Sequence, residues 1–304
     1  MDKYQISKEK AQIEISNLLQ PSDSDSVFHY TSINALYNII INSELRITNS
    51  MYLNDRNEFI DFVDELKFCL INNEKHFNNQ IYKDRSFLDE MKTNHSTQRY
   101  ENHNKAYYVL STCSSMGDLP MWNYYSKGDG VCIEFDKNLL FEIISDATSE
   151  ISDSKCYAYQ CIYSRNEKQE ILNTALNIVS NLFDEYNELN KSMWNILSPF
   201  SFSFKNSQFN YEKEFRILVK IDTDKLEELS TVKKGRITYD FFPTEENIKP
   251  CIKIRFEKLP IKKIIISPVN RNETVVNGLK LFLSKYDYRN ILVDKYESPL
   301  RSQY

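Results

Sequence analysis

Glycine is scarce in this sequence, which has five glycines among its 304 residues. The glycine-rich loops of P-loop and dinucleotide-binding Rossmann proteins need that residue because their backbone approaches a phosphate more closely than a Cβ atom would allow. The glycines stand too far apart to form either loop: Gly117, Gly128, Gly130, Gly235 and Gly278. Both protein classes are therefore excluded, and any nucleotide must be bound by other groups.

The cysteine and histidine spacings of a metal site are also missing. The six cysteines include no Cys-x-x-Cys pair and suggest no disulfide framework. We therefore predict buried, reduced thiols in a cytoplasmic protein. His76, His95 and His103 fall in a polar segment, residues 72–105, at separations that match no compact ligand set. We predict no metal site from them.

Signals for a membrane or for bulk binding of nucleic acid are absent as well. Charges are spread through the N-terminal residues, so no signal peptide is predicted. No uncharged apolar run approaches the roughly 20 residues that a membrane span needs. The formal net charge of −5 argues against nonspecific DNA binding through bulk positive charge, although a local basic groove would survive this average. We expect no membrane partner, and nucleic acid stays open.

What the chain does contain is a mixture of helix and strand patterns. Helical spacing of apolar residues predicts helices at about 4–20, 167–197 and 273–285. Three further helices are predicted from their N-terminal signals: one begins after an N-cap at Ser32, one at a capping box formed by Asp55 and Glu58, and one after an N-cap at Asp136. Alternating or continuous apolar runs predict strands at 27–31, 45–47, from 107, from 130, and at 155–163, 211–220, 251–257, 262–268 and 290–296.

These elements predict an α+β fold with one mixed, largely antiparallel sheet and helical insertions. Residues 1–26 would form an N-terminal helix and turn, and residues 27–301 a single α+β domain with a helical insertion at about 55–105. No repeat, linker or low-complexity tract divides that domain.

The segment YEKEFRILVK, residues 211–220, carries unusual polar residues. As a strand it would point Tyr211, Phe215, Ile217 and Val219 to one face and Glu212, Glu214 and Arg216 to the other. The polar row is either a solvated face or the floor of a site. Glutamine is nearly isosteric with glutamate, so the sequence predicts near wild-type stability for a glutamine at position 212 or 214.

Several landmarks together resemble a bacterial domain family of unassigned function that is often found near phage-defence genes. They are FHYTSINALYNIIINSEL (28–45), LND followed by Glu58, MWNYYSKGDGVCIEFD (121–136), YEKEFR (211–216), IIISP (264–268) and ESPLR (297–301). The resemblance runs from about residue 27 to 301 and implies no particular chemistry.

A second, more distant resemblance is to the ADP-ribosyltransferase superfamily. The matching elements occur in the superfamily's order: His29 on a first strand, Ser111-Thr112-Cys113-Ser114 on a second, and Glu212-Lys213-Glu214 entering a later strand. Cys113 departs from the superfamily's Ser-Thr-Ser element. The resemblance implies an ADP-ribosyltransferase-like fold with NAD as substrate, and a helical insertion between His29 and Ser111.

Under this resemblance His29 holds ribose hydroxyls of NAD, Glu214 stabilises the oxocarbenium-like ribose of the transition state, and Glu212 faces the acceptor. An aromatic cluster before the Gly-flanked loop could stack on a base, and the phosphates of NAD need arginine forks in place of a glycine loop. The predicted site is completed by Tyr30, Thr31, Arg46, Ser111, Thr112, Trp122, Tyr125, Arg216 and Arg301.

The leading hypothesis is an NAD-dependent ADP-ribosyltransferase-like effector, a toxin or phage-defence protein that modifies an unidentified macromolecule or hydrolyses NAD. A cognate inhibitor or a sensor protein is a further partner of such an effector. One alternative is a Mg²⁺-dependent nuclease that uses Asp55, Glu58, Glu212 and Glu214. Another is a non-catalytic subunit that senses a nucleotide or binds a partner. Structural roles also stay open, such as a semi-core histidine at His29 and a Glu214–Arg216 ion pair.

Overall fold

The structure is a computed structural model that describes residues 3–19, 24–53, 58–72, 105–116, 119–182, 196–231, 235–244 and 246–296. Contacts divide the chain into two compact units. Unit 1 comprises Met1–Pro21, Leu53–Lys105 and Tyr157–Asn210, and unit 2 comprises Ser22–Tyr52, Ala106–Cys156 and Tyr211–Tyr304. The sequence-based division at residue 27 stays a prediction.

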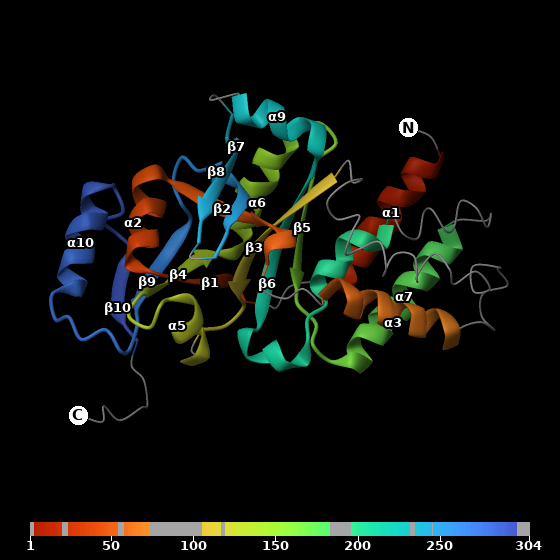
Figure 1. Cartoon of the computed structure of the whole chain (residues 1–304), viewed down its shortest axis with the longest axis horizontal. Coiled ribbons are helices and arrows are strands. Elements are labelled where there is room, and N and C mark those ends of the chain that lie inside the picture. Colours follow the sequence, from red (N-terminus) through yellow and green to blue (C-terminus); the bar gives the residue numbers. More distant parts are fainter. Residues whose placement is uncertain are drawn as a thin grey trace. The chain divides into compact units, whose positions relative to one another are not determined.

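Unit 2 contains most of the strands, as Figure 1 shows. The strands are β1 (Ser26–Thr31), β2 (Glu44–Asn49), β3 (Lys105–Cys113), β4 (Val131–Asp136), β6 (Glu214–Asp222), β7 (Ile237–Pro243), β8 (Ile248–Arg255), β9 (Ile261–Ile266) and β10 (Leu292–Lys295). They lie in the order β10-β9-β4-β1-β3-β2-β8-β7, and β6 also pairs with β3. The β10–β9 pair is parallel, and the other pairs along this path are antiparallel. The predicted α+β fold with a single mixed, mostly antiparallel sheet is therefore confirmed.

Two of the helices of unit 2, α2 and α6, begin at residues that the sequence predicts as N-caps. They are α2 (Ile33–Asn42), α5 (Leu119–Tyr125), α6 (Lys137–Ser149), α9 (Thr223–Thr231) and α10 (Val275–Lys285), with a 3-10 turn η1 (Ser50–Tyr52). Ser32 accepts a hydrogen bond from the backbone N–H of Ala35, and Asp136 accepts one from that of Leu139. Both predicted N-caps are thus confirmed, since each satisfies a donor that the first helical turn leaves unpaired.

Strand β6 begins later than the sequence pattern predicts. Residues 207–212 form a 3-10 helix, η4 (Ser207–Glu212), and Lys213 has a positive φ of 41°. The predicted strand from Tyr211 is therefore wrong at its start, because the left-handed residue breaks the alternation between Glu212 and Glu214. The strand itself is buried on both faces from Glu214 to Ile221. The polar row is accordingly not a solvated face.

Unit 1 is mainly helical. Its helices are α1 (Lys3–Leu18), α3 (Glu58–Asn72) and α7 (Arg165–Leu182), with a 3-10 helix η3 (Ser198–Ser203). Both α1 and α3 pack against α7. The predicted helix at 167–197 ends, as far as it is described, at Leu182, and Pro199 lies inside η3. Strand β5 (Lys155–Gln160) spans the sequence boundary between the two units.

Two further expectations concern the whole chain. No helix among the described residues is long and apolar enough to cross a membrane.

All six cysteines are free thiols, and all but Cys156 are buried. Burial together with the Glu65 carboxylate raises the pKa of Cys69 to about 12, so this thiol is protonated at neutral pH. The prediction of buried, reduced thiols is confirmed for five of the six.

Candidate functional site

A pocket of about 510 Å³ opens in unit 2 beside helix α2. One wall is a stripe of α2 at helical spacing, and the rest comes from the end of β1 and from β2, β7 and β8. The lining residues are His29, Thr31, Ala35, Asn38, Ile39, Asn42, Glu44, Leu45, Arg46, Phe241, Phe242, Pro243 and Lys253. This volume falls within the range of about 300–1,000 Å³ that is usual for small-molecule sites.

His29 enters this pocket as a neutral ring. Its Nδ1 atom lies 3.3 Å from the carbonyl oxygen of Ser111 on β3. Burial lowers the pKa of His29 below its usual value of 6.5, and the contact with the Ser111 carbonyl opposes that shift. A carbonyl can only accept, so Nδ1 carries the proton and Nε2 presents a lone pair. A ligand hydroxyl that donates to Nε2 would suit this tautomer.

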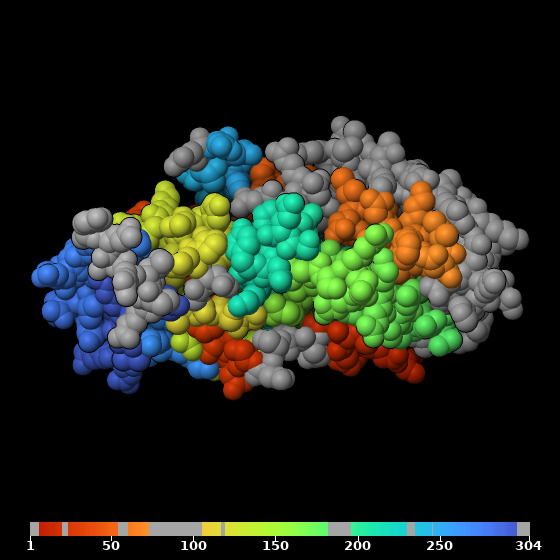
Figure 2. All heavy atoms as spheres, turned by 90° about the horizontal axis from the view of Figure 1, so that it is seen from below, coloured from red at the N-terminus to blue at the C-terminus, as the bar shows by residue number. Residues whose placement is uncertain are grey.

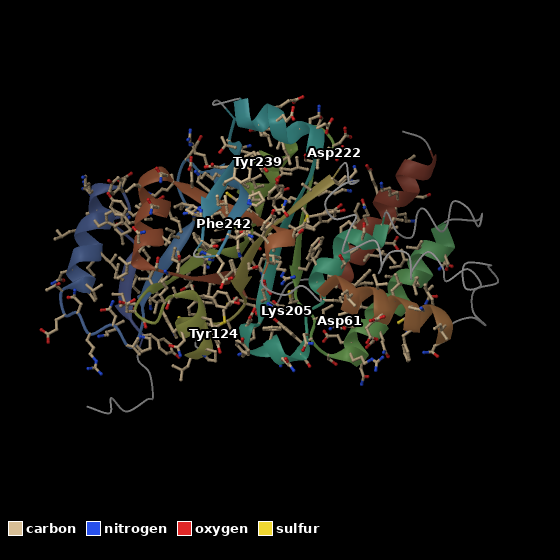
Figure 3. The ribbon with its side chains drawn as sticks, viewed as in Figure 1. Asp61, Tyr124, Lys205, Asp222, Tyr239 and Phe242 are labelled. Carbon is tan, nitrogen blue, oxygen red and sulfur yellow. The ribbon has the colours of Figure 1, made fainter. Side chains whose placement is uncertain are left out.

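Arg46 and Lys253 place two cations on the floor of the pocket. They are directly opposite each other on the antiparallel strands β2 and β8, so their side chains leave the same face. The Arg46 guanidinium lies 5.0 Å from the centroid of the Phe242 ring, and Lys253 forms an ion pair with Asp240 of β7. Figure 3 labels Phe242 on β7. Of the arginines predicted for phosphate binding, Arg46 lines this pocket and Arg216 does not, while Arg301 lies outside the described residues.

Tyr30 and Trp122 lie in the core. Trp122 is 1% exposed, and its ring makes an edge contact with Tyr30 at a centroid distance of 4.9 Å. Both belong to a buried cluster with Cys113, Met121, Cys132 and Ile265. A base could stack on Trp122 only if this cluster opened, so its predicted stacking role has no support from the packing and stays a prediction.

The predicted Ser-Thr element lies on β3, which pairs with both β1 and β6. Thr112 donates a hydrogen bond from Oγ1 to the carbonyl of Phe215, at 2.9 Å. The backbone N–H and the Oγ of Ser114 both donate to the carbonyl of Lys213, at 2.8 and 3.0 Å. These bonds hold the backbone turn between the two glutamates.

Glu212 and Glu214 are both buried, but they occupy different surroundings. The Glu214 carboxylate accepts two hydrogen bonds from Arg216, from Nε at 2.8 Å and from Nη2 at 2.9 Å. Glu212 accepts a bond of 3.0 Å from the hydroxyl of Tyr125 on α5. Neither glutamate is among the residues that line the pocket around His29.

Helix α5, which supplies Tyr125, reaches the molecular surface. In the space-filling view of Figure 2 the yellow residues of β3 and α5 form part of the visible face. Tyr124, the neighbour of Tyr125, is 72% exposed. The hydroxyl of Tyr125 thus connects the buried Glu212 carboxylate to a solvent-facing helix.

Unit 1 has a separate polar cluster between α3 and α7. The buried Lys168 ammonium bonds to the Asp61 carboxylate and, at 2.7 Å, to the carbonyl of Lys205. Asp61 and Lys205 are labelled in Figure 3. On the same helices Glu65 accepts from Arg165 and Gln169, both at 2.7 Å. Each of these charged groups contacts an oppositely charged group, a carbonyl or an amide. Such paired charges are typical of a contact that holds two helices together, so we assign this cluster a structural role.

Some predicted residues lie outside the described residues. Among them are Asp55, Arg301 and the three histidines of segment 72–105, and nothing is described of the Glu58 side chain. Within the part of the chain that is described, no group of three or more His, Cys, Asp or Glu could hold a metal ion. Of the four residues of the nuclease hypothesis, only Glu212 and Glu214 have described side chains, and the hypothesis stays a prediction.

Sequence reasoning missed Lys253, Glu44, Phe242 and the polar residues of α2. The periodicity of α2 could have indicated its pocket-lining side, because Asn38 and Asn42 recur on the side opposite its buried residues Leu36 and Ile40. No comparable signal identified Lys253, because its place in the pocket follows from strand pairing distant in sequence.

Part of the chain is similar to a known protein family. Residues 121–217 match the model of a family described as a protein of unknown function, DUF2971. The matched segment begins at α5 and ends in β6, so it contains Tyr125, Glu212, Glu214 and Arg216, whereas His29 and Arg46 precede it. Neither curated proteins nor solved structures gave a match.

Proposed function

We propose that this protein is an NAD-dependent ADP-ribosyltransferase-like enzyme, which transfers ADP-ribose to a macromolecular acceptor or to water. The observation that carries the proposal is the position of His29. Its neutral ring lines a pocket of nucleotide size, and its strand β1 is joined through β3 to β6, where Glu214 begins the strand. This order of strands agrees with the order of elements in the resemblance to ADP-ribosyltransferases.

The chemistry assigns separate tasks to these groups. Cleavage of the bond to nicotinamide generates an oxocarbenium-like ribose, which a nearby carboxylate stabilises more strongly than it stabilises the ground state. Glu214 supplies that carboxylate, and Glu212 faces the acceptor. His29 accepts a hydrogen bond from a ribose hydroxyl through Nε2 and orients the sugar. Thr31 on the same strand lines the same pocket and adds a hydroxyl group.

The ion pair between Glu214 and Arg216 favours a second candidate, a nucleotide-binding subunit without turnover. A carboxylate that accepts two bonds from a buried guanidinium has little capacity left for a ribosyl cation. In this case the His29 pocket would bind a nucleotide and pass the signal to a partner. A role as a toxin or phage-defence effector fits either candidate.

Labelled NAD separates the candidates. The protein is incubated with NAD labelled in the adenylate portion, with and without cell extract, and released nicotinamide and labelled macromolecules are measured. Transfer or hydrolysis that is lost in a His29→Ala variant supports the enzyme. Binding of NAD by calorimetry without any product over hours supports the non-catalytic subunit. If NAD neither binds nor reacts, the enzymatic proposal is wrong, and so is a subunit that senses NAD.

A matched pair of variants tests the roles of the glutamates. If Glu214 stabilises the ribosyl cation, Glu214→Gln lowers turnover at least 100-fold, about 3 kcal/mol of barrier, with NAD affinity little changed. If Glu212 faces the acceptor, Glu212→Gln reduces transfer more than hydrolysis. Equal loss of both reactions in the two variants would contradict this division of roles.

A further inference from the structure

We propose that the β2–β8–β7 floor of the pocket is a phosphate-binding platform, and that its ligand is a nucleoside diphosphate or a molecule that contains one. This inference deepens the proposed function, since NAD contains such a unit. It does not require that the ligand be cleaved.

The charges of the floor contain one more cation than carboxylates. Glu44 accepts two bonds through Oε1 from Arg255, at 2.8 and 3.2 Å, so these two charges offset each other. Lys253 is paired with Asp240, and that contact is the main cause of the lowered pKa of Asp240, which keeps its carboxylate ionised. Arg46 forms no salt bridge among the described residues, although it lies near enough to Asp240 to lower the pKa of that carboxyl as well. Two pairs of opposite charges and Arg46 together leave the floor with a net positive charge.

Arg46 is also held in a geometry that suits an anion. Its guanidinium lies over the Phe242 ring, which restrains the plane of the group, and no hydrogen bond to its N–H edge is found among the described residues. A phosphate can accept two parallel N–H bonds from such an edge. Lys253, directly across the strand pair, adds an ammonium that retains N–H donors beyond its contact with Asp240. Two adjacent cations of this kind suit a diphosphate.

The remaining walls indicate that the anion belongs to a larger molecule. A pocket of about 510 Å³ is several times larger than an inorganic phosphate needs. Phe241, Phe242 and Pro243 supply apolar surface, while His29 supplies an acceptor for a hydroxyl. A sugar and a base satisfy these walls, and the two phosphates satisfy the floor. The platform thus replaces the glycine loop that the sequence lacks.

Calorimetry with the full chain tests this assignment, using ADP, adenosine and inorganic pyrophosphate as probes. The variants are Arg46→Gln and Lys253→Gln. Lys263→Gln is the matched control, because the two lysines have similar surroundings. Lys263 is 29% exposed and Lys253 is 30% exposed, and each forms an ion pair with an aspartate on a neighbouring strand, Asp294 and Asp240 respectively. Circular dichroism melting confirms that each variant is folded.

We expect ADP to bind at least tenfold more tightly than adenosine or pyrophosphate alone. Arg46→Gln and Lys253→Gln should each weaken ADP binding about tenfold and leave adenosine binding unchanged, while Lys263→Gln binds like wild type. Absence of ADP binding, equal affinity for ADP and adenosine, or wild-type affinity in Arg46→Gln overturns the proposal.

The same set of proteins separates this inference from the proposed function. If ADP binds as expected and labelled NAD is never consumed, the phosphate platform stands and the enzymatic proposal fails. If NAD is consumed and the KM for NAD is unchanged in both Arg46→Gln and Lys253→Gln, the enzymatic proposal stands and the platform is wrong.

Discussion

The ion pair between Glu214 and Arg216 predicts that position 214 is important for stability. The two side chains are 5% and 2% exposed and share two hydrogen bonds of 2.8 and 2.9 Å. Glu214→Gln keeps the shape but removes the charge, and its amide N–H₂ would then face an arginine N–H. Removing one partner of a buried pair costs about 3–5 kcal/mol. Because both residues have further contacts, we expect about 3 kcal/mol.

Urea unfolding measures this cost. A Trp194→Phe background leaves Trp122 as the sole tryptophan, so its fluorescence reports on unit 2, which also contains β6. Glu212→Gln is the control, since the Tyr125 hydroxyl can still donate to the amide oxygen, and the substitution should cost about 1 kcal/mol. The double variant Glu214→Leu with Arg216→Met should recover part of the lost stability, because neither member of the ion pair is then left buried without the other. A Glu214→Gln protein within about 0.5 kcal/mol of wild type would refute this reasoning.

Three further predictions concern single residues. The lowered pKa of His29 means that the unfolded chain binds its proton more readily, so wild type should lose stability as pH falls below 6.5, and the loss should be smaller in His29→Gln when melting is compared at pH 7 and pH 5. Gly130→Ala would bring a Cβ to 2.3 Å from the Thr31 carbonyl oxygen and should cost more than about 2 kcal/mol in urea unfolding, whereas Gly128→Ala, with φ of 84° and open space, should cost about 1 kcal/mol. Lys168→Ala leaves Asp61 without its buried partner and should lower the melting temperature more than Lys168→Met, which keeps the aliphatic volume; equal melting temperatures would show that packing at this site has little effect.

Much of the local structure follows from short-range rules. Ser32 and Asp136 cap helices because their side chains reach backbone donors three residues away, and such a pattern is visible in sequence. The start of β6 was not visible in the same way. Alternation between 211 and 220 predicts a strand. In the structure Lys213 has a left-handed backbone conformation, and its carbonyl accepts hydrogen bonds from Ser114. Because Ser114 is distant in sequence, no local pattern reveals this contact. The expectation that glutamine is harmless at 214 stays a prediction, and the buried ion pair with Arg216 argues against it, because the cost depends on burial.

The sequence by itself determined the α+β class, the helix caps, the lack of a glycine-rich phosphate loop and the presence of His29 on the first strand of the sheet, because these depend on residues close together in the chain or on composition. Only the tertiary structure decided which charges meet. Arg46 and Lys253 are separated by some two hundred residues and become neighbours through the pairing of β2 with β8, while Arg216, equally basic in the sequence, is buried against Glu214. Strand pairing between distant segments sets these partners, and it depends on the packing of the whole sheet, which no local pattern records.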